Sequence, residues 1–290
     1  MHNTTTRSRL LLAVATLLLI PALLFSMATV EKEAAPQQRI VSLSPNVTET
    51  IYALGKGALL VGRSDYCTYP EEALALPSVG TLYSPSLEKL LALEPTLVIS
   101  SAFVGDQLLA AVEKAGIEVL QLDTQQSFGG TYDLIRAIAD EVGASDQGEL
   151  MILSMQNMVR DIALKAEKGI KPTVYMALDF GSFDSAATGD TFLSEMIRLA
   201  GGDNVADDAL YWTYSKEMLL FHDPEIILLS PRWGDESGEA TLIEFTTTKP
   251  YSDLTGSVRI FDDDLISRQG PRSALALKEL YALIHREDGR

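Results

Sequence analysis

This sequence of 290 residues contains a single cysteine, Cys67, and only three histidines. One cysteine excludes an intramolecular disulfide, so a hydrophobic core must hold the fold. The motifs of α/β-hydrolases, P-loop NTPases and zinc proteases (G-x-S-x-G, G-x-x-x-x-G-K-[ST] and H-E-x-x-H) do not occur. Beyond the N-terminal segment the histidines are His222 and His285, which excludes a three-histidine zinc site. The sequence offers neither a nucleophile with its base nor a set of metal ligands, so the chain is not expected to be an enzyme. An exported α/β enzyme is the alternative.

Basic residues are also few, because 23 lysines and arginines stand against 40 aspartates and glutamates, a net charge of -17. Nucleic acid and anionic lipid would be repelled by such a chain, so neither is expected as a partner. Hydrophobic residues make up 47% of the sequence, which is enough for a core without disulfides.

The N-terminal segment has the layout of a secretory signal peptide. Arg7 and Arg9 precede an apolar run at 10–25, and a small-x-small site, Ser26-Met27-Ala28, follows. The run is shorter than the roughly 20 residues that span a bilayer. We therefore expect residues 1–28 to be cleaved near Ala28, with a retained anchor as the alternative. Cys67 lies too far from this segment to accept a lipid, so a soluble exported protein is expected.

Short apolar runs alternate with amphipathic ones on both sides of the chain's middle. Strands are predicted at 39–44, 59–64, 96–101, 118–123, 173–178, 225–230 and 257–262. Helices are predicted near 47–54, from 86, at 106–116, at 191–202, from 215 and at 271–285, and this alternation is typical of parallel βαβ units. We expect an α/β protein with two Rossmann-like lobes that contain parallel sheets.

The middle of the chain differs, because residues 127–169 show a helical pattern with a break near 143–145. The second part, 146–168, would form a helix about 35 Å long, enough to join two lobes. A surface helix of a single domain is the alternative. The expected organisation is a signal peptide (1–28), a polar segment (29–38), an N-terminal lobe (39–144), an interlobe helix (145–170) and a C-terminal lobe (171–290).

A stretch of the first half recurs in the second. Residues 86–101 and 215–230 are identical at six of sixteen positions, and each copy carries a glutamate at its third position, Glu88 and Glu217. A first-turn glutamate suits the helix dipole by itself. Its presence at the equivalent place in two halves built on one plan raises the two residues to functional candidates.

Aromatic and arginine side chains gather in loops at predicted strand ends, where open α/β sheets usually bind ligands. They are Tyr66, Tyr69, Tyr83, Phe103, Phe180, Phe183, Tyr211, Trp212, Tyr214, Trp233, Arg268 and Arg272. Each aromatic residue taken singly could serve core packing. Together they predict a cleft for a large, planar, partly polar ligand.

Several stretches resemble the substrate-binding proteins of ABC importers for cobalamin and iron complexes. They are RIVSLSPNVTETIYALG, VGRSDYCTYPEEA, LPSVG, SLEKLLALEPTLVI, SKEMLLFHDPEIILLS and ISRQGPRSALALKELYALIH. The resemblance implies the class III fold, in which one long helix joins two lobes. It also implies a periplasmic monomer without a resident cofactor, which delivers its ligand to an ABC permease and its ATPase in the inner membrane.

Within the cobalamin-binding branch of this family, the resemblance assigns ligand contacts to Tyr66, to Asp264 and Arg268, and to Tyr211 or Trp212. Tyr83, Phe103 and Phe183 are expected to complete the site.

The resemblance also assigns permease docking to Glu88 and Glu217. Tryptophans that the cobalamin branch has near Leu82 and Ser101 are absent. A corrinoid is therefore the first expectation, and haem and ferric siderophores remain open. Tyrosines 66 and 83 could ligate haem iron, and arginines 63, 268 and 272 could meet a siderophore's negative charge.

Overall fold

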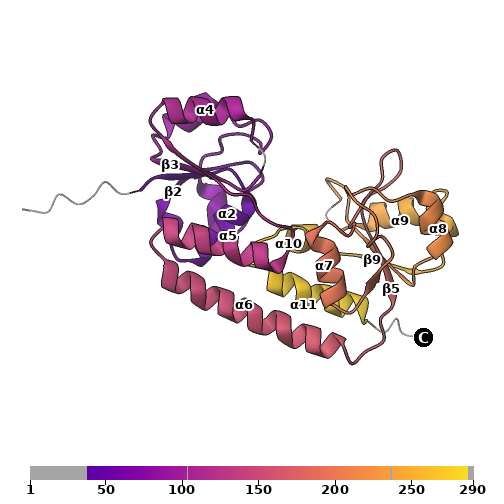
Figure 1. Ribbon diagram of the computed structural model, residues 1–290. Helices are drawn as coiled ribbons and strands as arrows, with labels where there is room; N and C mark the ends of the chain where they lie inside the picture. The colour runs from indigo at the N-terminus through magenta and orange to yellow at the C-terminus, as the bar shows by residue number, and fades with distance from the viewer. Residues whose placement is uncertain (1–37, 103, 236, 287–290) are drawn as a thin grey trace, which may run out of the picture. The chain divides into compact units, whose positions relative to one another are not determined.

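The computed structural model describes residues 38–102, 104–235 and 237–286. These residues form two α/β lobes, each built around its own sheet (Figure 1). The expected signal peptide lies outside the described residues, as does nearly all of the polar segment that follows it. Among the helices that are described, none is both long and apolar enough to cross a membrane.

The N-terminal lobe contains a sheet of four parallel strands in the order β2-β1-β3-β4. The strands are β1 (Ile40–Ser42), β2 (Leu60–Arg63), β3 (Leu97–Ser100) and β4 (Glu118–Gln121). The helices are α2 (Pro45–Ala53), α3 (Leu87–Ala92), α4 (Asp106–Lys114) and α5 (Phe128–Glu141), with short 3-10 turns η1 (Gly57–Leu59) and η2 (Glu71–Ala75). Helices α2 and α5 pack in one core cluster and α3 and α4 in another, so the sheet is covered on both faces. This explains why β1 and β3 read as continuous apolar runs.

The C-terminal lobe contains a sheet in the order β6-β5-β8-β9, with β7 paired to β5. Its strands are β5 (Thr173–Asp179), β6 (Ser185–Ala186), β7 (Asp203–Asn204), β8 (Ile226–Leu229) and β9 (Ser257–Ile260). Its helices are α7 (Phe192–Leu199), α8 (Lys216–His222), α9 (Glu239–Thr247), α10 (Asp263–Ile266) and α11 (Ser273–Ile284), with the 3-10 turn η3 (Tyr251–Asp253). The sheet is parallel as expected except at β6, which pairs antiparallel with β5.

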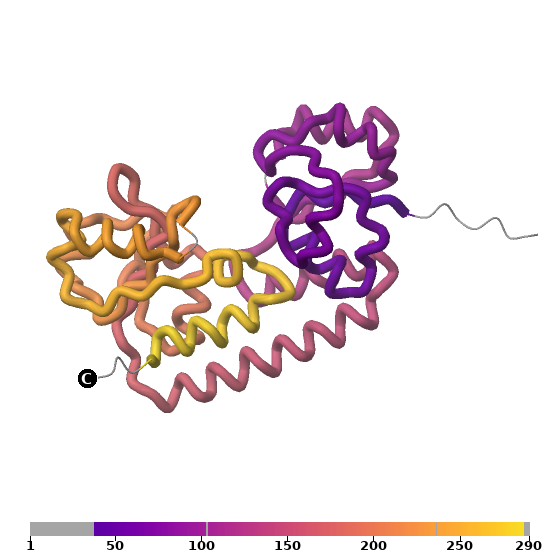
Figure 2. Tube along the Cα trace, turned by 180° about the vertical axis from the view of Figure 1, so that it is seen from behind, coloured from indigo at the N-terminus to yellow at the C-terminus, as the bar shows by residue number. Residues whose placement is uncertain are grey.

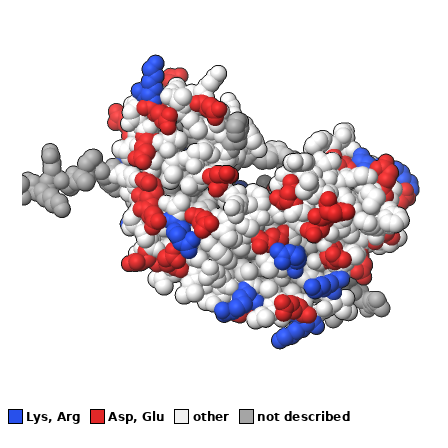
Figure 3. Space-filling model, in the orientation of Figure 1, with Lys and Arg blue, Asp and Glu red and all other residues white. Residues whose placement is uncertain are grey.

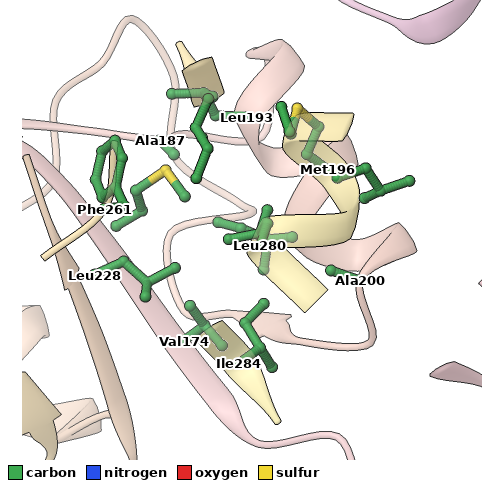
Figure 4. Packing of buried hydrophobic residues seen from close by; sticks show 14 of the residues in the cluster. Val174, Ala187, Leu193, Met196, Ala200, Leu228, Phe261, Leu280 and Ile284 are labelled. Atoms are coloured by element: carbon green, nitrogen blue, oxygen red, sulfur yellow. The ribbon is translucent and has the colours of Figure 1, made fainter. Parts of the chain in front are cut away.

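Helices α7 and α11 close one face of this second sheet. In Figure 4, Leu280 of α11 lies between Met196 of α7 and the strand residues Val174 and Leu228, and Phe261 belongs to the same cluster. All five side chains are at most 2% exposed, so this core is fully removed from water.

Helix α6 (Ser145–Ala166) contributes to the cores of both lobes. Its 22 residues give a length of about 33 Å. Ile152 and Met155 belong to a core cluster of the N-terminal lobe, and Ile162 belongs to one of the C-terminal lobe. In both ribbon and tube views α6 runs alongside α5 and α11 (Figures 1 and 2). The predicted break before it is present, because Gly143 takes a positive φ of 62° that a helix cannot continue through.

The repeated stretch forms the same joint in each lobe. Ser86 caps α3 and Ser215 caps α8, each through a side-chain oxygen that accepts a backbone N–H three residues on. The strands that follow, β3 and β8, are buried throughout and occupy the third place in their sheets.

The sequence did not predict helix α9, EATLIEFTT. Four of its nine residues are β-branched, which weakens the helical signal. Thr246 and Thr247 donate their hydroxyls to carbonyls of the preceding turn, and burial of Phe245 fixes the helix on the sheet.

Candidate functional site

A cavity of about 480 Å³ lies between the two lobes. Its wall consists of Ser44, Pro45, Asn46, Tyr83, Ser101, Ala102, Gln126, Phe192, Leu193, Trp212, Ser267, Arg268 and Gln269. The first residues follow β1 and β3 at the carboxyl ends of the strands, where open α/β sheets bind ligands. Two other cavities have volumes of about 410 and 510 Å³. The first is lined by residues of the C-terminal lobe and the second by residues of α5 and α6, and no strand end of the first sheet lines either of them. The interlobe cavity is therefore the candidate site.

The floor of the cavity on the N-terminal side is fixed by hydroxyl and amide groups. The backbone N–H of Ser101 donates to the Ser44 side chain at 3.0 Å, and the Ser101 hydroxyl donates to Asn46 Oδ1 at 2.6 Å. Asn46 Nδ2 in turn donates to the backbone carbonyl of Gln269 at 3.0 Å. These bonds hold polar groups in place before a ligand arrives.

Two loops meet at this site, 125–127 between β4 and α5 and 267–269 between α10 and α11, and side-chain amides hold both. Gln269 Nε2 donates to the carbonyls of Gln125 and Ser127 at 2.6 and 2.9 Å. The Gln126 side chain accepts the backbone N–H of Phe192, the first residue of α7, at 3.3 Å. The cavity wall thus combines neutral donors and acceptors from both loops.

A buried carboxylate, Glu49, anchors the segment between α10 and α11. Arg272 donates to its two oxygens at 2.7 and 2.8 Å, and Arg268 Nη1 donates to it at 3.2 Å. The Glu49 side chain is 2% exposed. Burial lowers the pKa of Arg272, but hydrogen bonds to Glu49 and its charge outweigh this, so the pKa is raised. Glu49 is not among the site residues predicted from the sequence. The partners lie more than 200 residues away, so the sequence could not show this cluster.

Arg268 is held on three sides. Besides Glu49, it donates through Nη2 to Asp264 and to the Thr68 hydroxyl, the latter at 3.1 Å. Asp264 itself does not line the cavity; its role here is to neutralise Arg268. The positive charge of Arg268, the cation on the described cavity wall, is therefore neutralised by neighbouring carboxylates.

Aromatic rings continue outward from the cavity. Tyr83, on the wall, lies 6.1 Å from Tyr66 between ring centroids, and Tyr66 lies 6.5 Å from Trp233. Both pairs are edge-to-face, with interplanar angles of 76° and 77°. Tyr66 and Tyr83 belong to the N-terminal lobe and Trp233 follows β8 in the C-terminal lobe, so this group spans the two.

Trp212 reaches the cavity from a loop with an unusual backbone. Tyr211 and Trp212 have φ values of 59° and 61°, in the left-handed region that costs non-glycine residues roughly 1 kcal/mol or more each. Asp190 accepts the N–H of Tyr211, and the Thr188 hydroxyl accepts the N–H of Trp212, each at 3.0 Å. The hydroxyl of Thr188 and the N–H of Tyr211 lower the pKa of Asp190. A strained backbone that is held by such hydrogen bonds is typical of ligand sites.

The structure thus brings Tyr83, Trp212 and Arg268 onto the cavity wall and Tyr66 beside it. Tyr211 and Phe183 are 79% and 71% exposed and do not line it. Phe103 lies outside the described residues.

The expected docking glutamates are both exposed, in the first turns of α3 and α8. The Ser215 hydroxyl donates to Glu217 at 2.8 Å and lowers the pKa of that carboxyl. Glu88 and Glu217 are therefore free to meet cations of another molecule. On the face shown in Figure 3, acidic side chains spread over both lobes and basic ones are fewer.

No group of three or more histidine, cysteine, aspartate or glutamate side chains is placed to hold a metal within residues 38–102, 104–235 and 237–286. His222 and His285 both form hydrogen bonds within the fold. His222 Nδ1 lies 2.7 Å from the Tyr214 hydroxyl, and His285 Nε2 lies 2.8 Å from the carbonyl of Ala200. A metal complex bound here would find the phenol of Tyr83 as a metal-binding group on the cavity wall.

A model of the periplasmic binding protein family matches residues 40–252. The uncharacterized ABC transporter substrate-binding lipoprotein YvrC of Bacillus subtilis (strain 168) is 30% identical over 267 residues, covering 89% of this chain and 82% of the relative. The vitamin B12-binding protein of Yersinia pestis (strain Pestoides F) is 28% identical, covering 89% of each chain. The apo structure of the periplasmic heme-binding protein RhuT from Roseiflexus sp. RS-1 superposes with a TM-score of 0.74 at 28% identity, covering 86% of this chain and 98% of that one.

Proposed function

Because this chain belongs to the periplasmic binding protein family, we propose that it is the substrate-binding component of an ABC importer and that its ligand is a corrinoid. The two-lobed α/β fold with parallel sheets is the class III fold that the sequence predicts, and RhuT shares it. The corrinoid would bind in the interlobe cavity and pass from there to a membrane permease.

The chemistry of the cavity wall is the observation that favours a corrinoid. Six wall residues carry neutral hydroxyl or amide groups: Ser44, Asn46, Ser101, Gln126, Ser267 and Gln269. A corrin ring carries neutral amide side chains at its edge, which need both donors and acceptors. Haem carries two carboxylates and many ferric siderophores are anionic, so these ligands need cations that are not already paired. Arg268 is paired with Glu49 and Asp264, which makes the site a poor match for an anion.

Haem is the second candidate, and a specific observation favours it. The phenol of Tyr83 lies on the cavity wall with Tyr66 beside it, and a tyrosine can serve as the axial ligand of haem iron. The similarity to RhuT points the same way.

The protein would act by binding alone, without a resident cofactor, because the metal complex is cargo. A corrinoid with its nucleotide is larger than a cavity of about 480 Å³, so part of it would extend beyond the wall residues. The aromatic group at the cavity mouth is the surface it would meet.

A competition titration tests the proposal. Cyanocobalamin added to the purified protein should give saturable heat at micromolar or lower concentration, and haemin should not displace it. Binding of haemin without binding of cyanocobalamin would transfer the proposal to the second candidate. Failure of both ligands, and of a ferric siderophore, would overturn it. The absorption spectrum of the protein purified from its own host gives an independent answer, because corrinoids and haem absorb differently.

Delivery requires a second surface, and we assign it to Glu88 and Glu217. Each carboxylate is exposed at the start of a helix that leads into a central strand of its lobe. Two acidic contacts at equivalent places suit a permease that presents cations to both lobes. The relatives are periplasmic or lipoprotein binding proteins, which supports export of this chain. N-terminal sequencing of the exported protein checks the proposed cleavage near Ala28.

A further inference from the structure

Trp233 is a large apolar side chain that the fold leaves in solvent. It is 94% exposed, the highest value among the large hydrophobic side chains that are described. An indole gains much from burial, so its position outside the core requires a reason. The residue lies just beyond β8, at the carboxyl end of a central strand where ligands bind in such sheets.

The loop that carries Trp233 is held firmly on both sides of it. Asp235 accepts the backbone N–H and the hydroxyl of Thr241 at 2.7 and 2.6 Å, and the N–H of Arg232 donates to the same hydroxyl at 3.0 Å. The Arg232 guanidinium lies 4.4 Å from the Phe180 ring centroid and 3.1 Å from Glu244. The indole is thus presented by an ordered turn between two anchored neighbours.

The direction in which Trp233 points connects it to the candidate site. Its ring meets Tyr66 of the other lobe edge-to-face, and Tyr66 meets Tyr83 on the cavity wall in the same manner. Three rings therefore run from solvent to the cavity, contributed by both lobes. A ligand too large for the cavity would emerge along this row.

We infer that Trp233 covers the outer part of the bound macrocycle from the C-terminal lobe, as the outermost ring of the row that it forms with Tyr66 and Tyr83. The inference rests on the proposed function. It adds that Trp233 is the residue through which the C-terminal lobe favours a flat ring over a compact chelate. An exposed aromatic ring gains burial when such a ligand is bound and loses it on release. Trp233 is thereby a determinant of affinity and of ligand shape, with no part in holding the fold.

Affinity measurements on Trp233→Ala and Trp233→Phe test this role. We expect Trp233→Ala to weaken cyanocobalamin binding by about 10-fold, because the ring is buried only at the outer edge of the ligand, and Trp233→Phe to recover much of the loss. The matched control is Phe221→Ala on α8, which removes another aromatic ring of the same lobe, 78% exposed but not part of the cavity wall. It should leave the affinity unchanged, and all three variants should melt like the wild type.

A spectroscopic readout reports contact directly. The chain has two tryptophans, so a ¹⁵N spectrum contains two indole N–H signals, and Trp233→Phe assigns them. Cyanocobalamin should shift the Trp233 signal, and gallium protoporphyrin should do so if haem is the ligand. Ligand binding by the wild type with an unmoved Trp233 signal and full affinity of Trp233→Ala would overturn the inference alone. Absence of any binding by the wild type would overturn the proposed function together with the inference.

Discussion

The buried carboxylate Glu49 offers the sharpest test of how this fold is held. Glu49→Gln keeps the size of the side chain but removes its charge and replaces one acceptor by a donor. Arg272 would then lose its bidentate partner, at 2.7 and 2.8 Å, and Arg268 would lose a contact at 3.2 Å. Two guanidinium groups that are only 16% and 18% exposed would be left without their shared anion.

Breaking one partner of a buried ion pair typically costs about 3–5 kcal/mol of unfolding free energy. For a domain of this size each kcal/mol shifts the melting temperature by roughly 2–4 °C, so a fall of about 6–20 °C is expected. Residual exposure of the arginines and the remaining bonds of Arg268 to Asp264 and Thr68 favour the lower half of this range.

Thermal unfolding followed by circular dichroism measures the shift. The matched control is Glu149→Gln, since Glu149 also pairs with two nitrogens of one arginine, Arg136, but is 56% exposed. Solvent screens such a pair, so the control should melt close to the wild type. Equal melting temperatures for Glu49→Gln and the wild type would refute the claim that this cluster fastens the segment between α10 and α11 to the N-terminal lobe.

The docking proposal predicts that the double variant Glu88→Lys, Glu217→Lys keeps its ligand affinity but loses transport and loses binding to its permease in nanodiscs. The reason is that exposed charges steer partners rather than hold a fold. Unchanged transport by the double variant would contradict the proposal. A pH titration tests the Trp212 loop. Because the pKa of Asp190 is lowered in the folded protein, its support of the loop is complete above the unfolded value of about 4 and is lost as the pH falls through the folded value. In a Trp233→Phe background the fluorescence emission of Trp212 should change in that acid range, and Asp190→Asn should abolish this transition. A pH profile that Asp190→Asn leaves unchanged would show that the carboxylate does not hold the loop.

The elements with strong local patterns were predicted well. The runs 96–101 and 225–230 appear as β3 and β8, and the long helical tract appears as α5 and α6 with its break at Gly143. These features depend on residues within a turn or two of one another, so the sequence carries their signal. The two-residue strand β6 and helix α9 were missed, because the first is too short for a periodic pattern and the second is rich in β-branched residues.

The candidate site was predicted in part. Aromatic residues at strand ends pointed to Tyr83 and Trp212, which do line the cavity, and equally to Phe183 and Tyr211, which do not. A loop's sequence does not reveal which of its side chains turns inward. For Trp212 the answer depends on left-handed backbone angles that Asp190 supports from another loop.

By itself the sequence determined the two α/β lobes, the helix between them and the duplicated joint with its exposed glutamates, because each arises from periodicity and capping within short stretches. Only the tertiary structure decided how the lobes meet. Glu49 joins arginines 219 and 223 residues away, and Trp233 meets Tyr66 from the opposite lobe. Contacts over such separations follow from packing of whole lobes, which no local pattern encodes.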